Sequence, residues 1–372
     1  MIQQSAEGSL THEHAECGQK SKFTCSILLI LASMTFALLL SELVFRYLLF
    51  NGGSFMGPLR RAEFYANEWD LDFFKLRHFF GHKYIPPTDE NLGWRNDRID
   101  YVDGDYAHID DKNLRGRTPV LLFGDSFAQC HTTEEECFQG ILNKHPDFNK
   151  SYYLINYGVS GYGVDQVLLL YRSTIMRYRN PIVIIGIMNY DLDRNIMPVT
   201  WGLKPYFEAS NGKLRLKNSH LFSYVDIFFR DNPPKINSYL WRLLVHEGPL
   251  PENIRLWMKS LEEDKQNIKE VSTPIIGSLA DELKFNNIRH IFVLFEWPKR
   301  MVKAPDWRVN YLVDVFHKKK IDYIMARGAI INNQQSAQFN WSDYSVDDGH
   351  PNYFYNQLVS QQILSWVLEL DQ

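Results

Sequence analysis

Two segments, far apart in the chain, carry the residue types of a serine nucleophile and its base. Gly124-Asp125-Ser126 lies in the first half of the sequence, and Asp347-Asp348-Gly349-His350 lies near the C-terminus. A serine hydroxyl is a weak nucleophile until a base removes its proton. We predict that His350 is this base for Ser126, and that Asp347 fixes the tautomer of the imidazole and stabilises the imidazolium.

Ester chemistry through a serine also needs hydrogen-bond donors for the negative oxygen of the tetrahedral intermediate. Gly161 ends the segment Gly158-Val159-Ser160-Gly161, and Asn189 begins Asn189-Tyr190-Asp191. A glycine lets the backbone approach a ligand closely. We predict an oxyanion hole formed by the backbone N–H groups of Ser126 and Gly161 and by the side-chain amide of Asn189. This mechanism requires neither a metal nor an organic cofactor.

The elements that must position these residues are apolar runs of strand length. They occupy residues 120–123, 153–156, 182–187, 291–295 and 323–325. Helical stretches alternate with them, among them 164–178 and 274–284, the latter with Pro274 at its first helical position. This alternation predicts a parallel sheet covered by helices on both faces. Ligands of such sheets bind beyond the carboxyl ends of the strands, where the candidate residues lie.

Two further elements are indicated near these segments. Residues 201–218, with Asn211-Gly212 between two apolar stretches, are typical of a hairpin that could overhang the cleft and set specificity. A final amphipathic helix is expected after His350. The side chains expected near one face of it are Phe354, Leu358, Ile363, Trp366 and Leu370.

The four candidate segments together resemble the SGNH, or GDSL-type, hydrolase superfamily. Its sequence blocks match Gly124-Asp125-Ser126, Gly161, Asn189 and Asp347-x-x-His350 in the same order, over residues 113–367. The resemblance implies a three-layer α/β/α, flavodoxin-like fold with about five parallel strands. It also implies Ser126 as nucleophile, Gly161 and Asn189 as oxyanion donors, and Asp347 and His350 as the rest of the triad.

A membrane-anchored bacterial branch of this superfamily is similar at three further places. These are Glu42-x-x-x-Arg46 at the end of an N-terminal apolar segment, Gly93-Trp94, and Asn113-Leu114-Arg115-Gly116. This second likeness implies an envelope enzyme that acts on O-acyl groups of polysaccharides or lipids.

Other residues compete for the catalytic roles. Ser160 is the other candidate nucleophile, although its segment lacks the second glycine of a Gly-x-Ser-x-Gly elbow. Asp348 could replace Asp347, at the less familiar spacing of two residues before His350. Asp125 is expected to hydrogen-bond its own turn rather than to act as an acid or base.

Cys130 and Cys137 lie close together after the candidate nucleophile. They could form a disulfide that braces the loop beside Ser126, or they could be two free thiols. A metal site that includes His131 is the third alternative. Zinc normally takes four protein ligands in structural sites and three in catalytic ones, and no further partner is evident nearby, so we expect no metal here.

The N-terminal region contains a candidate membrane span. Residues 23–41 hold no charge over 19 positions, and the apolar character continues to residue 50. A helix with a rise of about 1.5 Å per residue needs roughly 20 residues to cross a bilayer core. We predict an uncleaved signal anchor over 23–50, with Glu42 and Arg46 paired at its end. A buried core helix and a cleaved signal peptide are the alternatives, but no small-residue cleavage site follows.

The side of the membrane is not decided by charge. Lys20 and Lys22 precede the span, whereas Arg46, Arg60 and Arg61 follow it. An oxidised cysteine pair would favour a main domain outside the cytoplasm.

Composition excludes several classes of protein. The 372 residues include 40 Lys and Arg against 44 Asp and Glu, a formal net charge of −4, which argues against a nucleic-acid binder. Hydrophobic residues make up 45% and charged residues 23%, as in ordinary globular proteins, so the chain is not disordered. With only 4 cysteines, it is not a disulfide-stapled mini-scaffold.

We therefore expect a polar tail (1–22), a transmembrane anchor (23–50), an irregular connecting segment (51–117) and a catalytic domain (118–372). The expected function is a serine esterase of the bacterial inner membrane, facing the periplasm, that removes O-acetyl or short acyl groups from an envelope glycan or lipid. One alternative is a polysaccharide O-acetyltransferase with the same triad. The other is a non-catalytic envelope scaffold or glycan-binding protein, which would need neither Ser126 nor His350.

Overall fold

A computed structural model describes the chain over residues 7–84, 87–95, 101–102, 105–106, 114–210, 213–218, 221, 224–261, 263–301, 303–332 and 340–370. The expectations for Asn113 and for the Asn211-Gly212 turn lie outside the described residues.

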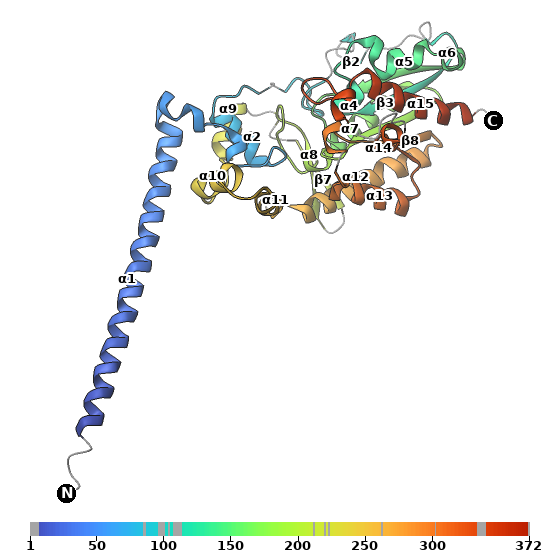
Figure 1. Ribbon diagram of the computed structural model, residues 1–372. Coiled ribbons are helices and arrows are strands. Elements are labelled where there is room, and N and C mark those ends of the chain that lie inside the picture. Colours follow the sequence, from blue (N-terminus) through green and yellow to red (C-terminus); the bar gives the residue numbers. More distant parts are fainter. Residues whose placement is uncertain are drawn as a thin grey trace.

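A sheet of five parallel strands forms the centre of the catalytic part (Figure 1). Its strand order is β4-β3-β5-β8-β9, so the chain reverses direction across the sheet between β3 and β5, and ligands of such sheets bind at this reversal. Each strand contains one of the predicted apolar runs. The strands are β3 (Thr118–Gly124), β4 (Tyr152–Gly158), β5 (Ile182–Met188), β8 (Arg289–Phe295) and β9 (Tyr323–Met325).

Helices cover both faces of the sheet and produce the predicted three layers. Alternate side chains of β3 point to opposite faces: Leu121 and Phe123 join one hydrophobic core, and Val120 and Leu122 join the other. The first core is closed by α7 (Val164–Thr174), α12 (Lys265–Phe285) and α13 (Trp307–Lys319). The second is closed by α5 (Phe138–Lys144), α6 (Pro146–Ser151), α14 (Ala326–Ile331) and α15 (Tyr353–Glu369).

Two predictions about the helices are wrong in detail. Pro274 does not begin a helix but lies inside α12, whose N-cap is Asp264. The helix begins before the proline because Ile268 and Val271, which precede Pro274, are buried in the same core as the residues that follow Pro274. In α15, Phe354 is 59% exposed, whereas Tyr355 is buried and its hydroxyl donates to the carbonyl of Glu296 at 3.2 Å.

The N-terminal part begins with one long helix, α1 (Glu7–Asn51), which extends away from the catalytic part (Figure 1). Within it, Ser26–Asn51 is long and apolar enough to cross a membrane: its most apolar stretch of 18 residues has a mean hydropathy of 2.3, and none of that stretch is buried. Among the described side chains of α1, those of its last turns pack on the rest of the protein, and Leu49 there is buried.

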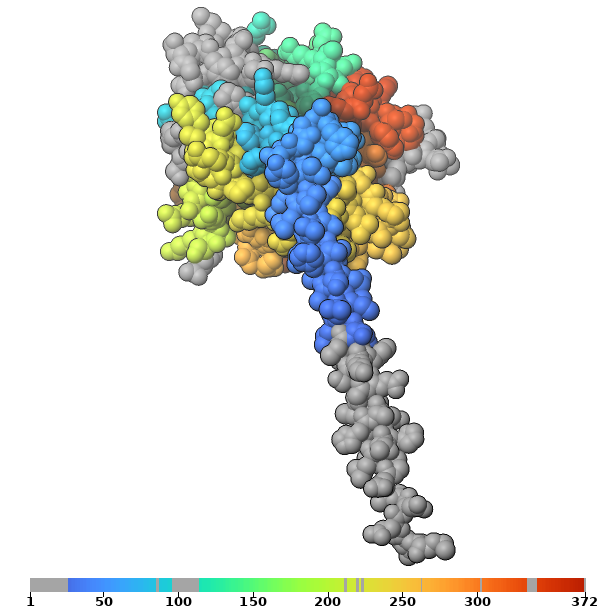
Figure 2. Space-filling model, turned by 90° about the vertical axis from the view of Figure 1, so that its left-hand side faces the viewer, coloured from blue at the N-terminus to red at the C-terminus, as the bar shows by residue number. Residues whose placement is uncertain are grey.

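The connecting segment after α1 is more regular than the sequence indicated. It contains a 3-10 helix (Gly53–Leu59), a second one (Ala62–Phe64) and α2 (Leu71–Phe79). These pack with a later part of the chain into two small apolar clusters beside α1. The later helices in these clusters are α9 (Val225–Asp231) and α10 (Tyr239–Glu247), whereas α11 (Glu252–Ser260), which follows α10, has no residue in either cluster. Figure 2 shows this region gathered around the upper end of α1.

Two short antiparallel pairs of strands lie outside the central sheet. The predicted hairpin consists of β6 (Tyr206–Ser210) and β7 (Lys213–Lys217), and the buried Phe207 packs it against the core that includes α7 and α12. β1 (Tyr101–Val102) pairs with β2 (Asp105–Tyr106).

Candidate active site

The candidate nucleophile lies where the central strand ends. β3 ends at Gly124, and the one-turn helix α4 (Ser126–Gln129) begins directly after Asp125. Asp125 caps this helix by accepting a hydrogen bond from the N–H of Phe127 at 2.9 Å, as expected for a turn residue. Ser126 is therefore held at the first position of a helix, at the carboxyl edge of the sheet, and is 5% exposed.

His350 reaches this serine from the other end of the chain. Its Nε2 lies 3.0 Å from Ser126 Oγ, a hydrogen-bond distance for a nucleophile and its base. The two residues are 224 positions apart, and the loop before α15 brings them together.

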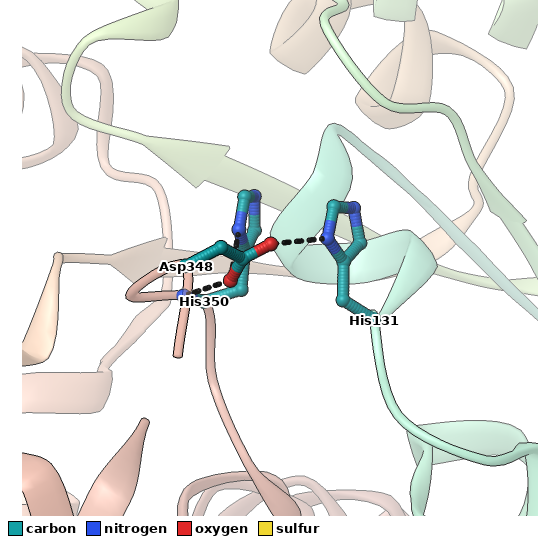
Figure 3. A group of neighbouring side chains, drawn as sticks. All are labelled: His131, Asp348 and His350. Atoms are coloured by element: carbon teal, nitrogen blue, oxygen red, sulfur yellow. Dashed lines mark hydrogen bonds and ion pairs between the residues drawn. The ribbon is translucent and has the colours of Figure 1, made fainter. Parts of the chain in front are cut away.

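Asp348, rather than the predicted Asp347, pairs with His350. Its Oδ1 lies 3.0 Å from Nδ1 of His350 and also accepts the backbone N–H of His350 at 2.9 Å (Figure 3). The reason is a tight turn: the N–H of Gly349, which has a φ of 88°, donates to the carbonyl of Val346 at 2.8 Å. This turn folds the carboxylate of Asp348 back onto the ring, so the alternative with the less familiar spacing is the one observed.

A second imidazole, which sequence reasoning treated only as a metal ligand, lies against the first. The ring of His131 is stacked on that of His350, with centroids 3.8 Å apart and 20° between the planes. Its Nδ1 lies 3.3 Å from the other oxygen of Asp348, and its Nε2 lies 3.0 Å from Ser160 Oγ. Figure 3 shows Asp348 in contact with both rings. The only signal in the sequence is the position of His131 shortly after α4.

This arrangement shifts the ionisation of the site. Burial lowers the pKa of His350, His131 lowers it further, and the carboxylate of Asp348 opposes both effects. Burial acts to raise the pKa of Asp348, but the hydrogen bond from the His350 N–H and the two imidazoles outweigh it and hold that pKa below its usual value. His350 therefore stays neutral, and able to accept a proton, down to a lower pH than a free histidine does.

The same three residues carry side chains of metal-ligating types. Ligand atoms of His131, Asp348 and His350 all lie within 4.8 Å of one another. The rings are stacked, however, and each Nδ1 lies within 3.3 Å of an oxygen of Asp348, so both nitrogens already have a carboxylate partner and the arrangement does not require a metal ion. The sequence alternative with Cys130 and Cys137 does not fit either, because these two residues form a disulfide with a Cα–Cα distance of 5.7 Å.

That disulfide lies directly beside the site. Cys130 follows α4 and has a φ of 75°, a backbone conformation that a non-glycine residue rarely adopts. Its N–H donates to the carbonyl of Ser126 at 2.9 Å, and Asn356 of α15 donates to Cys130 Sγ at 3.3 Å. The bridge therefore links the nucleophile's turn to the helix that follows His350.

Two aromatic side chains also pack against the imidazole of His350, the candidate base. Trp297, just after β8, lies edge-on to His350 with centroids 4.9 Å apart, and Phe127 lies 5.6 Å from the same ring. An added Cβ at Gly349 would lie 3.1 Å from Trp297. Trp297 was not predicted as a site residue, because a tryptophan after a strand is usually a packing residue.

The predicted oxyanion donors follow the two strands that flank β3. The N–H of Val159 donates to the carbonyl of Gly124 at 3.0 Å, which fixes the loop of Gly161 beside the nucleophile's turn. Gly161 has a φ of 82°, and a Cβ there would lie 2.3 Å from the ring of Trp201. Asn189 follows β5 and is 3% exposed, and its Oδ1 has no hydrogen-bond partner among the described residues.

A buried arginine joins the ends of these three strands. Arg194 Nη1, on α8 (Asp191–Arg194), lies 3.5 Å from Asp125 and 2.6 Å from Asp191, and donates to the carbonyl of Tyr162 at 2.8 Å. Each of these partners is one or two residues from Ser126, Gly161 or Asn189. Burial raises the pKa of Asp191, the nearby Asp125 raises it further, and Arg194 opposes them. No sequence motif indicated this role for Arg194.

The connecting segment also reaches the site. Trp94 Nε1 donates to the carbonyl of Ser160 at 3.0 Å, and the ring of Trp69 stacks on Tyr190 with centroids 4.7 Å apart. Of the segment predicted to overhang the cleft, Trp201 is the residue that contacts Gly161, whereas the hairpin itself packs on the core.

Comparisons with known proteins give the following likenesses. No family model and no curated protein matches the chain. Among solved structures, it is similar to the psychrotrophic esterase EstA from Pseudoalteromonas sp. (13% identity, 67% of this chain and 98% of that chain, TM-score 0.38). It is also similar to TesA (11%, 67% and 97%, TM-score 0.37) and to the acetyl xylan esterase AlAXEase (15%, 67% and 99%, TM-score 0.39).

The strand order and the site residues define the class of fold by themselves. A β4-β3-β5-β8-β9 parallel sheet with helices on both faces is a three-layer, doubly wound α/β/α fold, and in this chain serine, glycine and asparagine follow its first three strands and a histidine precedes the last helix.

Proposed function

We propose that the protein is a membrane-anchored serine ester hydrolase. The observation that carries this proposal is the 3.0 Å contact between Ser126 Oγ and His350 Nε2. The carboxylate of Asp348 lies 3.0 Å from the other ring nitrogen. A hydroxyl, a neutral imidazole and a carboxylate in this order are the groups that acyl transfer through a serine requires.

The reaction proceeds in two steps through an acyl-enzyme. His350 takes the proton of Ser126 as Oγ bonds to the ester carbonyl carbon, and the carbonyl oxygen becomes negative. The N–H groups of Ser126 and Gly161 and the amide of Asn189 stabilise this oxygen. His350 then gives its proton to the leaving alcohol as the C–O bond breaks. In the second step it takes a proton from a water that attacks the acyl carbon, and it returns this proton to Ser126 Oγ as the bond between the acyl carbon and Oγ breaks and the acid leaves.

Two features support the location that we propose for the domain. α1 serves as the anchor in this proposal, because its Ser26–Asn51 segment is apolar and none of its most apolar stretch of 18 residues is buried. The Cys130–Cys137 disulfide supports a catalytic domain on the oxidising side of that membrane, the periplasm in a bacterium.

The substrate class is an O-acetyl or short acyl ester on an envelope glycan or lipid. Tryptophan side chains support it, because flat aromatic rings pack well against sugar rings. Trp201 is 42% exposed and lies against Gly161, and Trp69 stacks on Tyr190, the residue after Asn189.

The test uses the full-length chain in lipid nanodiscs. Acetate release from an acetylated oligosaccharide and hydrolysis of p-nitrophenyl acetate, butyrate and octanoate are measured for the wild type, Ser126→Ala and the surface control Ser151→Ala. We expect Ser126→Ala to lose activity by about 10³-fold or more and Ser151→Ala to retain it. Undiminished turnover in Ser126→Ala, or none in the wild type on any of these esters, would overturn the proposal. Transfer of acetyl to a second oligosaccharide in place of its release would indicate an acetyltransferase.

A further inference from the structure

Helix α11 has an apolar side that no part of the described protein covers. None of its residues is buried. Ile254 and Trp257, three residues apart and so on one side of the helix, are 41% and 61% exposed, and Leu261, directly after the helix and one turn beyond Trp257, is 66% exposed. A helix of this length is marginal in water and normally gains its stability by packing an apolar side against a core. Another apolar environment must therefore provide that packing.

The neighbouring helix α10 extends the same surface. Its Trp241 and Leu244, three residues apart and so on one side of the helix, are 52% and 40% exposed. The opposite side is held by the protein, since Tyr239 and His246, seven residues apart, are buried. Figure 1 shows α10 and α11 next to each other at the end of the catalytic part that lies beside α1.

The start of α10 is fixed to α1 at a known level along that helix. Glu42 of α1 accepts the hydroxyl of Ser238 at 2.8 Å and the backbone N–H groups of Tyr239 at 2.8 Å and Leu240 at 3.1 Å. Arg46, one turn later, donates to the carbonyl of Ile236 at 3.0 Å. This joint is a small network of charged groups and backbone, so α10 cannot lie far from α1.

The length of the apolar segment places this joint at the edge of a bilayer. About 20 helical residues cross the hydrocarbon core. Counted from residue 23, where the charge-free run begins, this length ends at Glu42, one turn before Arg46. Both charged residues then lie at the headgroup level, and α10, which begins beside Glu42, lies at that level too.

We propose that the exposed apolar side of α10 and α11 is inserted into the interfacial layer of the membrane that α1 crosses. The inference rests on the membrane anchor of the proposed function and is independent of its ester chemistry. Tryptophan is favoured at the membrane interface, where Trp241 and Trp257 would lie. Arg242, Arg255 and Lys259, on the same two helices, suit the anionic headgroups of that layer. The catalytic domain is then held against the bilayer at two places.

The experiment measures the depth of single side chains in the full-length chain. Cys17 and Cys25 are replaced by Ser, while Cys130 and Cys137 stay in their disulfide, and a nitroxide is attached at Trp241→Cys or Trp257→Cys. The matched control is Phe285→Cys, at an exposed apolar residue (86%) at the end of α12. Leu39→Cys reports on α1 itself. Collision rates with O₂ and with a polar nickel chelate are measured in nanodiscs of phosphatidylethanolamine and phosphatidylglycerol.

We expect the ratio of O₂ to nickel collisions at 241 and 257 to be severalfold higher than at 285 and to approach the ratio at 39. A ratio at 241 and 257 equal to that at 285 would overturn the inference, and a lipid-like value at 39 would leave the anchor intact. Low rates with both reagents at 241 and 257 would mean that protein, such as a second copy of the chain, covers the surface, and this too would overturn it. Ester turnover in the same samples shows separately whether the proposed chemistry holds.

Discussion

The imidazole rings of His131 and His350 are stacked on each other and share one carboxylate, that of Asp348. The rings are 3.8 Å apart, and Asp348 lies 3.3 Å from Nδ1 of His131 and 3.0 Å from Nδ1 of His350. His131 therefore affects the base in two ways: through its own positive charge when protonated, and through the carboxylate that both rings share.

The first prediction concerns the pH dependence of His131→Ala. His350 acts as a base only when neutral, so kcat/KM rises with pH through its pKa. Burial and then His131 lower that pKa in the wild type, below the ordinary value of about 6.5. Removal of His131 takes away one lowering effect, and the acidic limb of the pH profile should move to higher pH. His131→Phe keeps a stacked ring without a charge and should move the limb in the same direction. A limb that stays in place in both variants would contradict this account.

The second prediction compares two adjacent aspartates. Asp348→Asn removes the carboxylate that orients His350, and kcat on an acetyl ester should fall by about 10²- to 10⁴-fold. Asp347→Asn, the matched control, should leave kcat close to that of the wild type. A larger loss of kcat in Asp347→Asn than in Asp348→Asn, measured under saturating substrate, would contradict this account and support the sequence-based choice of Asp347.

The third prediction concerns stability. Arg194→Met leaves the buried carboxyl groups of Asp125 and Asp191 without their counter-charge and should cost about 3–5 kcal/mol. Arg172→Met breaks an exposed pair with Glu282 and should cost about 0–1 kcal/mol. Thermal unfolding of the full-length chain in detergent compares the two. Similar melting temperatures for both variants would refute the role given to Arg194.

A fourth prediction tests the loop of Gly161. An alanine there must adopt a φ of 82° and place its Cβ 2.3 Å from Trp201, so the loop has to move. Since its N–H is a proposed oxyanion donor, kcat should fall by about 10²-fold or more. Gly328→Ala in α14, where an added Cβ meets nothing within 4 Å, is the control and should keep its activity. Full activity in Gly161→Ala would remove this residue from the oxyanion hole.

The layers of the fold were predictable because they depend on local patterns. Each apolar run of strand length lies in a parallel strand, the one over residues 182–187 in a fully buried strand, and the residues that follow the strands meet at one edge. Pro274 misled the prediction of a helix start, because burial of Ile268 and Val271 outweighs the hydrogen bond that proline removes.

The parts of the site that escaped prediction depend on contacts between distant segments. Asp348 was ranked below Asp347 on spacing alone, whereas the turn at Gly349 decides which carboxylate meets His350. Arg194 and His131 lie in no motif; the partners of Arg194 come from three segments of the chain and those of His131 from two. For the same reason α2 was missed, since it is held by residues that lie far along the chain in α9 and α10.

The most direct test of the central claim is the position of a covalent adduct. Ser160 is the alternative nucleophile to be excluded, because its Oγ lies 3.0 Å from a ring nitrogen of His131, which could serve as its base. The full-length chain is treated with a fluorescent organophosphonate, digested, and its labelled peptide identified by mass spectrometry. We predict one labelled peptide, the one that contains Ser126, and no label in Ser126→Ala. An adduct on Ser160, or on any serine in the Ser126→Ala variant, would contradict Ser126 as the nucleophile.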